Sequence, residues 1–143
     1  MKSEDIIEEI KLIKYQLKLM KMMIDGDRYP YFMFITDHDI SEEKEKLLRK
    51  IILFLKLRLD QKEEDDSDLY TEDKELLTSI FKKAGLSSDV LFSTQKPTFN
   101  EFSTYVKCFL GEDINVTYLL MSMEKQSMFI QLCDSLLKDI SHQ

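Results

Sequence analysis

Apolar residues in the first part of the chain fall on two sides of one expected helix. One set repeats at alternating steps of four and three residues, and we call it the heptad seam: Ile6, Ile10, Ile13, Leu17, Met20 and Ile24. A second set, which we call the opposite stripe, consists of Leu12, Tyr15, Leu19 and Met22. At about 100° per residue the two sets lie nearly opposite each other. The pattern predicts a helix from about Glu4 to Ile24, with Ser3 as its N-cap.

A helix with two opposed apolar faces needs a neighbour on each of them, because a large apolar face left in water marks an interaction site. We expect one face to pack into the core of its own chain and the other to contact a partner. The sequence leaves open which face does which. It also leaves open that a single chain covers both faces.

The residues after this helix predict a corner between two helices, and its motif is Asp27, Arg28, Tyr29 and Pro30. Gly26 suits the C′ position of the first helix, and Pro30 has the fixed φ that suits a first helical turn. A short helix is expected from Tyr31 to about Thr36.

Arg28 is the most notable charge in this corner motif. We expect it to pair with Asp25, with Asp27 or with a carbonyl at the end of the first helix. The alternative is that Arg28 binds an anion together with the free N–H groups of the helix that begins at Pro30.

The rest of the chain also has helical periodicity. Further helices are expected from after Ser41 to about Gln61, from a Thr71 cap to Gly85, from a Thr98–Glu101 capping box to Gly111, from Asn115 through Met123, and from about Ser127 onward. Val90, Leu91 and Phe92 fit either an extended piece or a helical turn. Three glycines and two prolines in 143 residues are too few for the tight turns of a sheet protein. The sequence therefore predicts one all-α domain over residues 1–143, a bundle of about six helices.

The net charge of −7 comes from one segment, since residues 60–75 hold nine acids and two lysines and the remainder is neutral. We expect this segment to be a solvated acidic linker. Because the chain has no clustered basic patch, we expect no nucleic-acid partner. Lys11, Lys14, Lys18 and Lys21 line one edge of the first helix, either as a solvated edge or as an attraction site for the acidic segment.

Motifs that carry catalytic or metal chemistry are missing. The chain has no glycine-rich phosphate loop, nucleophile elbow or zinc-binding helix motif, so no catalytic residue, cofactor or metal ligand is expected. A calcium-loop pattern that starts at Glu64 has Leu69 where the sharp turn needs glycine. Asp37, His38 and Asp39 could form a divalent-metal site together with Asp25 and Asp27 if the two loops converge, but nothing in the sequence brings them together. Cys108 and Cys133 are expected to be buried thiols.

No apolar run approaches the length of a membrane span, and the N-terminus turns acidic where a secretion signal would become apolar. We therefore expect a cytoplasmic protein without a membrane partner.

Two stretches resemble a known family. The run from Asp27 to Phe32 followed by residues 40–43, and the later run from Thr98 to Phe102 followed by Gly111, are similar to the small uncharacterised cytoplasmic Firmicute proteins typified by YhaI. The resemblance covers about residues 4–62 and 97–140. It implies a compact multi-helical fold that self-associates, with no activity, cofactor or catalytic residue to transfer. Relative to that family, residues 63–96 look like an insertion that begins with the acidic linker.

These observations favour a non-enzymatic interaction or regulatory protein that forms a homo-oligomer, with a dimer as the favoured state. The alternative is a protein that binds a small molecule or a divalent metal in a pocket between helices.

Overall fold

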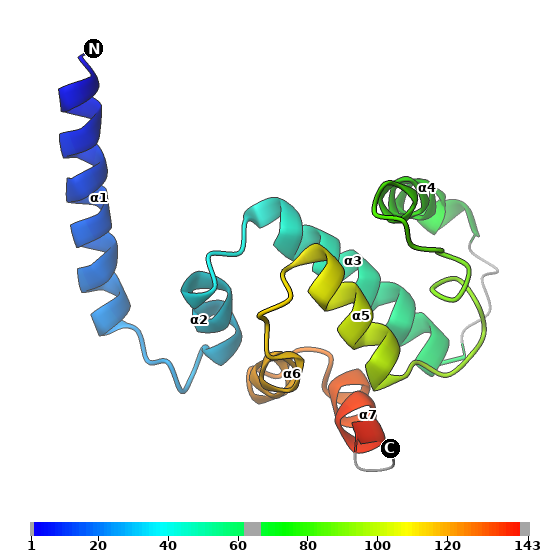
Figure 1. The fold of residues 1–143 in the computed structure, drawn as a ribbon. Helices are drawn as coiled ribbons and strands as arrows, with labels where there is room; N and C mark the ends of the chain where they lie inside the picture. The colour runs from blue at the N-terminus through cyan, green and yellow to red at the C-terminus, as the bar shows by residue number, and fades with distance from the viewer. Residues whose placement is uncertain (1, 62–66, 141–143) are drawn as a thin grey trace.

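The protein is all-α in the computed structural model, which describes residues 2–61 and 67–140; the side chains of residues 67–69 lie outside that description. The described ranges contain seven helices and no strand (Figure 1). The helices are α1 (Ser3–Met23), α2 (Pro30–Asp37), α3 (Glu42–Leu59), α4 (Ser67–Lys83), α5 (Phe99–Phe109), α6 (Val116–Lys125) and α7 (Ile130–Ile140). Each of the seven helices has a counterpart among the ranges expected from the sequence, although the bundle was expected to have about six helices.

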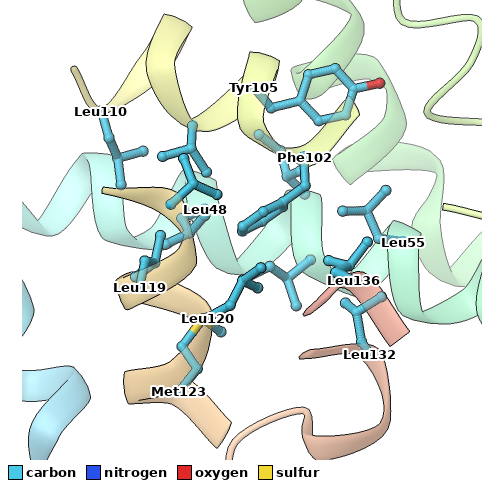
Figure 2. Close-up of a cluster of buried hydrophobic side chains, with 14 of the residues drawn as sticks. Leu48, Leu55, Phe102, Tyr105, Leu110, Leu119, Leu120, Met123, Leu132 and Leu136 are labelled. Carbon is cyan, nitrogen blue, oxygen red and sulfur yellow. The ribbon is translucent and has the colours of Figure 1, made fainter. Parts of the chain in front are cut away.

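Helices α2 to α7 form a body around one hydrophobic core. In Figure 2 the α3 residues Leu48 and Leu55 face Phe102 of α5, and side chains of α6 and α7 close the cluster from the other side. Helix α4 joins this core through Phe81, whose ring lies 5.1 Å from the rings of both Tyr105 and Phe109. The apolar faces predicted for these helices therefore meet in one core.

Three helix starts are confirmed by their caps. The side-chain oxygen of Ser41 accepts a hydrogen bond from the Lys44 N–H, that of Thr98 from the Glu101 N–H, and that of Asn115 from the Tyr118 N–H. These bonds satisfy N–H groups that have no partner within the helix. Ser3 is not a cap, because α1 already begins at that residue and Lys2 holds the N-cap position without a side-chain bond.

The end of α4 is also confirmed. Gly85 has a φ of +76°, and its N–H bonds to the Lys82 carbonyl at 3.1 Å. The Leu86 N–H bonds to the Phe81 carbonyl at 2.9 Å, and Leu86 packs against the core. This is the pair of bonds that defines a Schellman ending, and a residue without Cβ adopts its left-handed conformation most easily.

The start of α4 differs from the prediction. The helix begins at Ser67, so Thr71 lies inside it and the expected linker is helical from Ser67 onward. The remainder of the expected linker, at residues 62–66, lies outside the described residues. The ring centroids of Tyr70 and Phe54 lie 6.0 Å apart, and the Asp73 carboxylate pairs with the Lys50 ammonium at 3.2 Å. These contacts hold the acidic segment on α3, and acids near a helix N-terminus suit the helix dipole.

The segment that includes α4 belongs to the core of the body. Leu77, Phe81 and Leu91 are fully buried there. The Phe92 N–H bonds to the Ser88 carbonyl at 3.2 Å. Of the two conformations expected for residues 90–92, an extended piece or a helical turn, the chain therefore adopts the helical turn. The interpretation of residues 63–96 as an insertion stays a prediction, but its described part is integrated into the fold.

The last helix begins at Ile130 rather than near Ser127. Ser127 and Phe129 have φ values of +63° and +49°, which no α-helix tolerates. The Met128 N–H bonds back to the Met123 carbonyl at 2.9 Å and ends α6. Periodicity alone does not reveal this reversal, because Met128 and Phe129 pack on the core from the connection and keep the apolar pattern unbroken.

The two cysteines have different environments. Cys133 is buried, as predicted, and burial together with the nearby Glu124 carboxylate raises the pKa of its thiol to about 12. Cys108 is exposed, so the prediction that it is buried is wrong. It lies on the outer side of α5, next to Lys107, while Tyr105 and Val106 face the core.

Candidate interaction surface on α1

Helix α1 stands apart from the body (Figure 1). It has no buried residue, and each residue of the heptad seam and of the opposite stripe is exposed, from 41% for Leu19 to 75% for Met22. The expectation that one face packs into the core of its own chain is therefore wrong. The alternative that one chain covers both faces is wrong for the same reason.

Few polar contacts tie α1 to the body. The Lys21 ammonium pairs with the Asp37 carboxylate at the end of α2, and both side chains are about half exposed. The Lys11 ammonium pairs within α1, with Glu8 at 3.6 Å. Ion pairs this exposed contribute little to stability, so α1 is held by its covalent connection more than by packing.

The corner between α1 and α2 is a turn built on Asp25. Its carboxylate accepts a hydrogen bond from the Asp27 N–H at 2.9 Å, and its carbonyl accepts from the Arg28 and Tyr29 N–H groups. Helix α1 ends earlier than predicted, with Ile24 as its extended C-cap, so Gly26 is not its C′ residue. Pro30 does occupy the first turn of α2, as predicted.

Arg28 makes none of its three expected structural contacts within the described residues. Its guanidinium lies 5.5 Å from the centroid of the Tyr29 ring, and no ion pair joins it to Asp25 or Asp27 within the described residues. Asp27 instead lies 3.8 Å from the Lys125 ammonium of α6. The prediction of a structural Arg28–Asp pair is wrong, because the guanidinium stacks on the adjacent ring.

The anion-binding alternative for Arg28 loses the helix N–H groups on which it relied, and a contact between the guanidinium itself and an anion stays a prediction. The Gln126 side-chain oxygen accepts hydrogen bonds from the Tyr31 and Phe32 N–H groups at 2.8 and 3.2 Å. The N-terminal N–H groups that an anion would use therefore already have a partner. Sequence reasoning missed Gln126, since more than 90 residues separate it from α2.

An open groove lies along the corner. Its volume is about 500 Å³ and it is lined by Met23, Ile24, Asp25, Arg28, Tyr29, Phe32, Met33 and Thr36. Tyr29 and Phe32 are themselves exposed and stack with 6.2 Å between ring centroids. The groove thus continues the apolar surface of α1 onto α2.

The residues considered for metal binding do not converge. In residues 2–61 and 67–140 no three His, Cys, Asp or Glu side chains are placed to hold a metal ion. The His38 ring stacks on Phe34 at 4.0 Å, and its Nδ1 is 2.9 Å from the Phe34 carbonyl. The calcium-loop pattern that starts at Glu64 lies partly outside the described residues.

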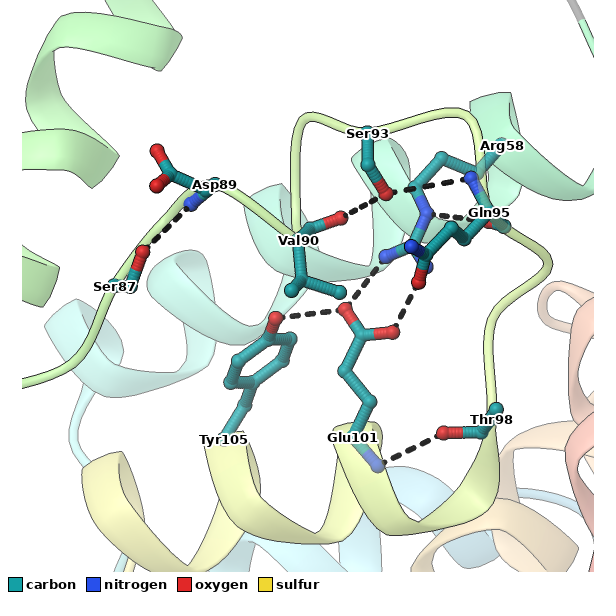
Figure 3. Close-up of polar contacts among 9 residues, drawn as sticks. All are labelled: Arg58, Ser87, Asp89, Val90, Ser93, Gln95, Thr98, Glu101 and Tyr105. Carbon is teal, nitrogen blue, oxygen red and sulfur yellow. Dashed lines mark hydrogen bonds and ion pairs between the residues drawn. The ribbon is translucent and has the colours of Figure 1, made fainter.

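The most buried charges form a structural network (Figure 3). The Arg58 guanidinium donates to both carboxylate oxygens of Glu101, at 2.5 and 2.9 Å, and to the Gln95 carbonyl at 2.8 Å. The Tyr105 hydroxyl donates to the same carboxylate at 2.7 Å, and burial raises the pKa of Tyr105. The side chains of Arg58 and Glu101 are 4% and 10% exposed. The network is fully paired and joins α3, α5 and the loop before α5, so it leaves no group free for chemistry.

Sequence reasoning missed this network as well. Its one signal was Arg58 among the apolar positions of α3, where a charge is buried only with a partner. Glu101 was expected to complete a capping box with Thr98. Its carboxylate turns to Arg58 instead, and only the Thr98 half of the box forms.

No helix in the described part of the chain combines the length and the apolar character needed to cross a membrane. Comparisons with protein-family models, with curated proteins and with solved structures find no match. The resemblance of residues 4–62 and 97–140 to the YhaI-like family therefore stays a prediction.

Proposed function

We propose that this chain is a non-enzymatic interaction or regulatory protein of the cytoplasm that self-associates through α1. The observation that carries the proposal is the exposure of all ten residues of the heptad seam and the opposite stripe, which lie on α1 and its C-cap. Contiguous apolar surface of this extent on a soluble protein marks an interaction site.

A second copy is the partner that the seam fits best. Seams with apolar residues every 3.5 positions on average are typical of helices that pair with helices of the same kind. In proteins, packing of the apolar face supplies most of the stability of a helix. Self-association would give α1 that packing.

The test is the molar mass in solution, measured by light scattering coupled to size-exclusion chromatography at tens of micromolar. We expect a multiple of the 17.0 kDa chain mass for the wild type. Leu17→Asp places a charge in the seam and returns the mass to that of one chain. Gln16→Asp adds the same charge one residue away and keeps the assembly. A wild-type mass of one chain contradicts the proposal.

A second candidate is a small-molecule-binding protein, which the groove at the corner favours. The Arg28 guanidinium beside the apolar side chains of Tyr29 and Phe32 suits an amphiphile with an anionic head. Thermal denaturation with decanoate tests it. A saturable rise in melting temperature that Arg28→Gln abolishes supports this function, and no rise at millimolar decanoate contradicts it.

A further inference from the structure

We infer that α1 helices of separate copies pair in parallel and in register through the heptad seam, with Glu9 of each copy beside Lys14 of the next. This inference rests on the proposed self-association and specifies its geometry. It follows from the charges that flank the seam.

The seam can be written in heptad positions. Ile10 and Leu17 occupy a, and Ile6, Ile13 and Met20 occupy d, while Ile24 at the next a position is the extended C-cap of the helix. The e positions on one flank are then Ile7, Lys14 and Lys21, and the g positions on the other flank are Glu9, Gln16 and Met23. One flank is thus basic and the other carries an acid.

Parallel pairing brings each g position beside the e position five residues further along the neighbouring helix, and such pairs set partner choice and orientation. Glu9 then meets the partner's Lys14, and by symmetry Lys14 meets the partner's Glu9. Gln16, which is uncharged, meets the partner's Lys21. The parallel arrangement therefore places opposite charges together and no like charges.

Antiparallel pairing of the same seam is less favourable. The register that aligns the two seams matches Ile10 with the partner's Met20 and Ile13 with the partner's Leu17. In an antiparallel pair, e positions face e positions, so Lys14 lies beside the partner's Lys14. Two like charges on neighbouring positions repel each other.

The opposite stripe lacks these features. Continued toward the N-terminus with the same steps, it reaches Glu8 and Asp5 instead of apolar residues. Parallel pairing through it would set Glu4 beside the partner's Glu9. The heptad seam is therefore the better surface for pairing with a copy of α1.

The structure leaves the seam and its flanks available. Glu9 and Lys14 are exposed, and in the described part of the protomer neither has an ion-pair partner. The body joins α1 at the C-terminal end of the helix (Figure 1), so parallel helices would carry their bodies at the same end. The ion pair between α1 and its own body lies at Lys21, beyond Glu9 and Lys14.

Charge reversal in the full chain tests the pairing. Glu9→Lys or Lys14→Glu turns two attractions into two repulsions in each pair of copies, and we expect either to weaken association by about tenfold. An equal mixture of the two variants restores affinity, because each repulsive pair becomes attractive across the mixed interface. Glu4→Lys and Lys18→Glu make the same charge changes at outward-facing b positions and serve as controls. Sedimentation equilibrium gives the dissociation constants.

Cross-linking reports the orientation independently. In a chain with Cys108→Ser, Met20→Cys forms an intermolecular disulfide if the helices are parallel and in register, while Lys18→Cys does not. An antiparallel pair instead links Ile10→Cys chains to Met20→Cys chains. That outcome, or no rescue in the mixture, overturns the parallel geometry while self-association stands. A wild-type protein of one-chain mass overturns both.

Discussion

Helices α1 and α3 have nearly the same apolar content and opposite environments. About half of the residues in each are apolar. Helix α3 buries Leu48, Ile51, Ile52, Phe54, Leu55 and Arg58, whereas α1 buries none. The α3 residues form one broad arc that the other helices of the body cover. The α1 residues divide into two opposed faces, which no single neighbouring surface can cover.

The difference shows what apolar periodicity does and does not specify. Periodicity identifies the face of a helix that leaves water, and it does so equally well for a core and for an interface. Periodicity does not specify whether the surface that covers this face comes from the same chain or from another one. In this protein the body buries its apolar faces internally, whereas both apolar faces of α1 are exposed.

The largest effect is expected at the buried charges of the body. Arg58→Met leaves the Glu101 carboxylate buried without its guanidinium, which costs about 3–5 kcal/mol of unfolding free energy in urea denaturation. The double variant Arg58→Met/Glu101→Leu should regain most of that loss. A single variant as stable as the wild type would show that the pair contributes nothing to the body.

A matched truncation compares the two regions directly. Leu55→Ala in α3 removes a side chain with 0% exposure and should lower the unfolding free energy by about 2–5 kcal/mol. Leu17→Ala in α1, where the side chain is 57% exposed, should leave urea unfolding of dilute protein unchanged and weaken association instead. Equal losses of stability for the two variants would mean that α1 is packed within its own chain.

The joint between α2 and α6 should show an intermediate effect. Gln126→Ala removes the acceptor of two N–H groups at the start of α2 and should cost about 1 kcal/mol, as other N-cap losses do. Gln126→Glu keeps the acceptor and adds a charge that suits the helix dipole, so its stability should equal or exceed that of the wild type. Thermal unfolding of the three proteins distinguishes these outcomes.

The smallest effect is expected at the ion pair between α1 and the body. Lys21→Ala removes the partner of Asp37, yet both groups are about half exposed, so the loss should stay below about 0.5 kcal/mol. The difference in unfolding free energy between Lys21→Ala and the wild type should change little when salt is added. A loss comparable to that of Arg58→Met would contradict the description of α1 as weakly tethered.

Much of the body could be predicted because its signals are local. Ser41, Thr98 and Asn115 cap their helices through bonds to residues three positions away, and Gly85 ends α4 through its own conformation. Each of these depends on neighbouring residues that the sequence displays directly.

What could not be predicted depends on distant residues. Gln126 caps α2, Asp139 accepts from the Phe99 N–H at the start of α5, and Arg58 pairs with Glu101 across 43 positions. Nothing in the local pattern of either partner identifies the other. Helix α1 is the extreme case, because one of its faces was expected to pack on the body and the apolar residues of both faces are exposed.

Hydrogen exchange of α1 as a function of protein concentration tests the central claim most directly. The account predicts that the amides of residues 3–23 exchange rapidly in dilute protein and become protected as concentration rises, while the amides of α3 stay protected throughout. Protection of α1 that is already complete at the lowest concentration would mean that its own chain covers it. Rapid exchange of α1 at every concentration would mean that no second copy does.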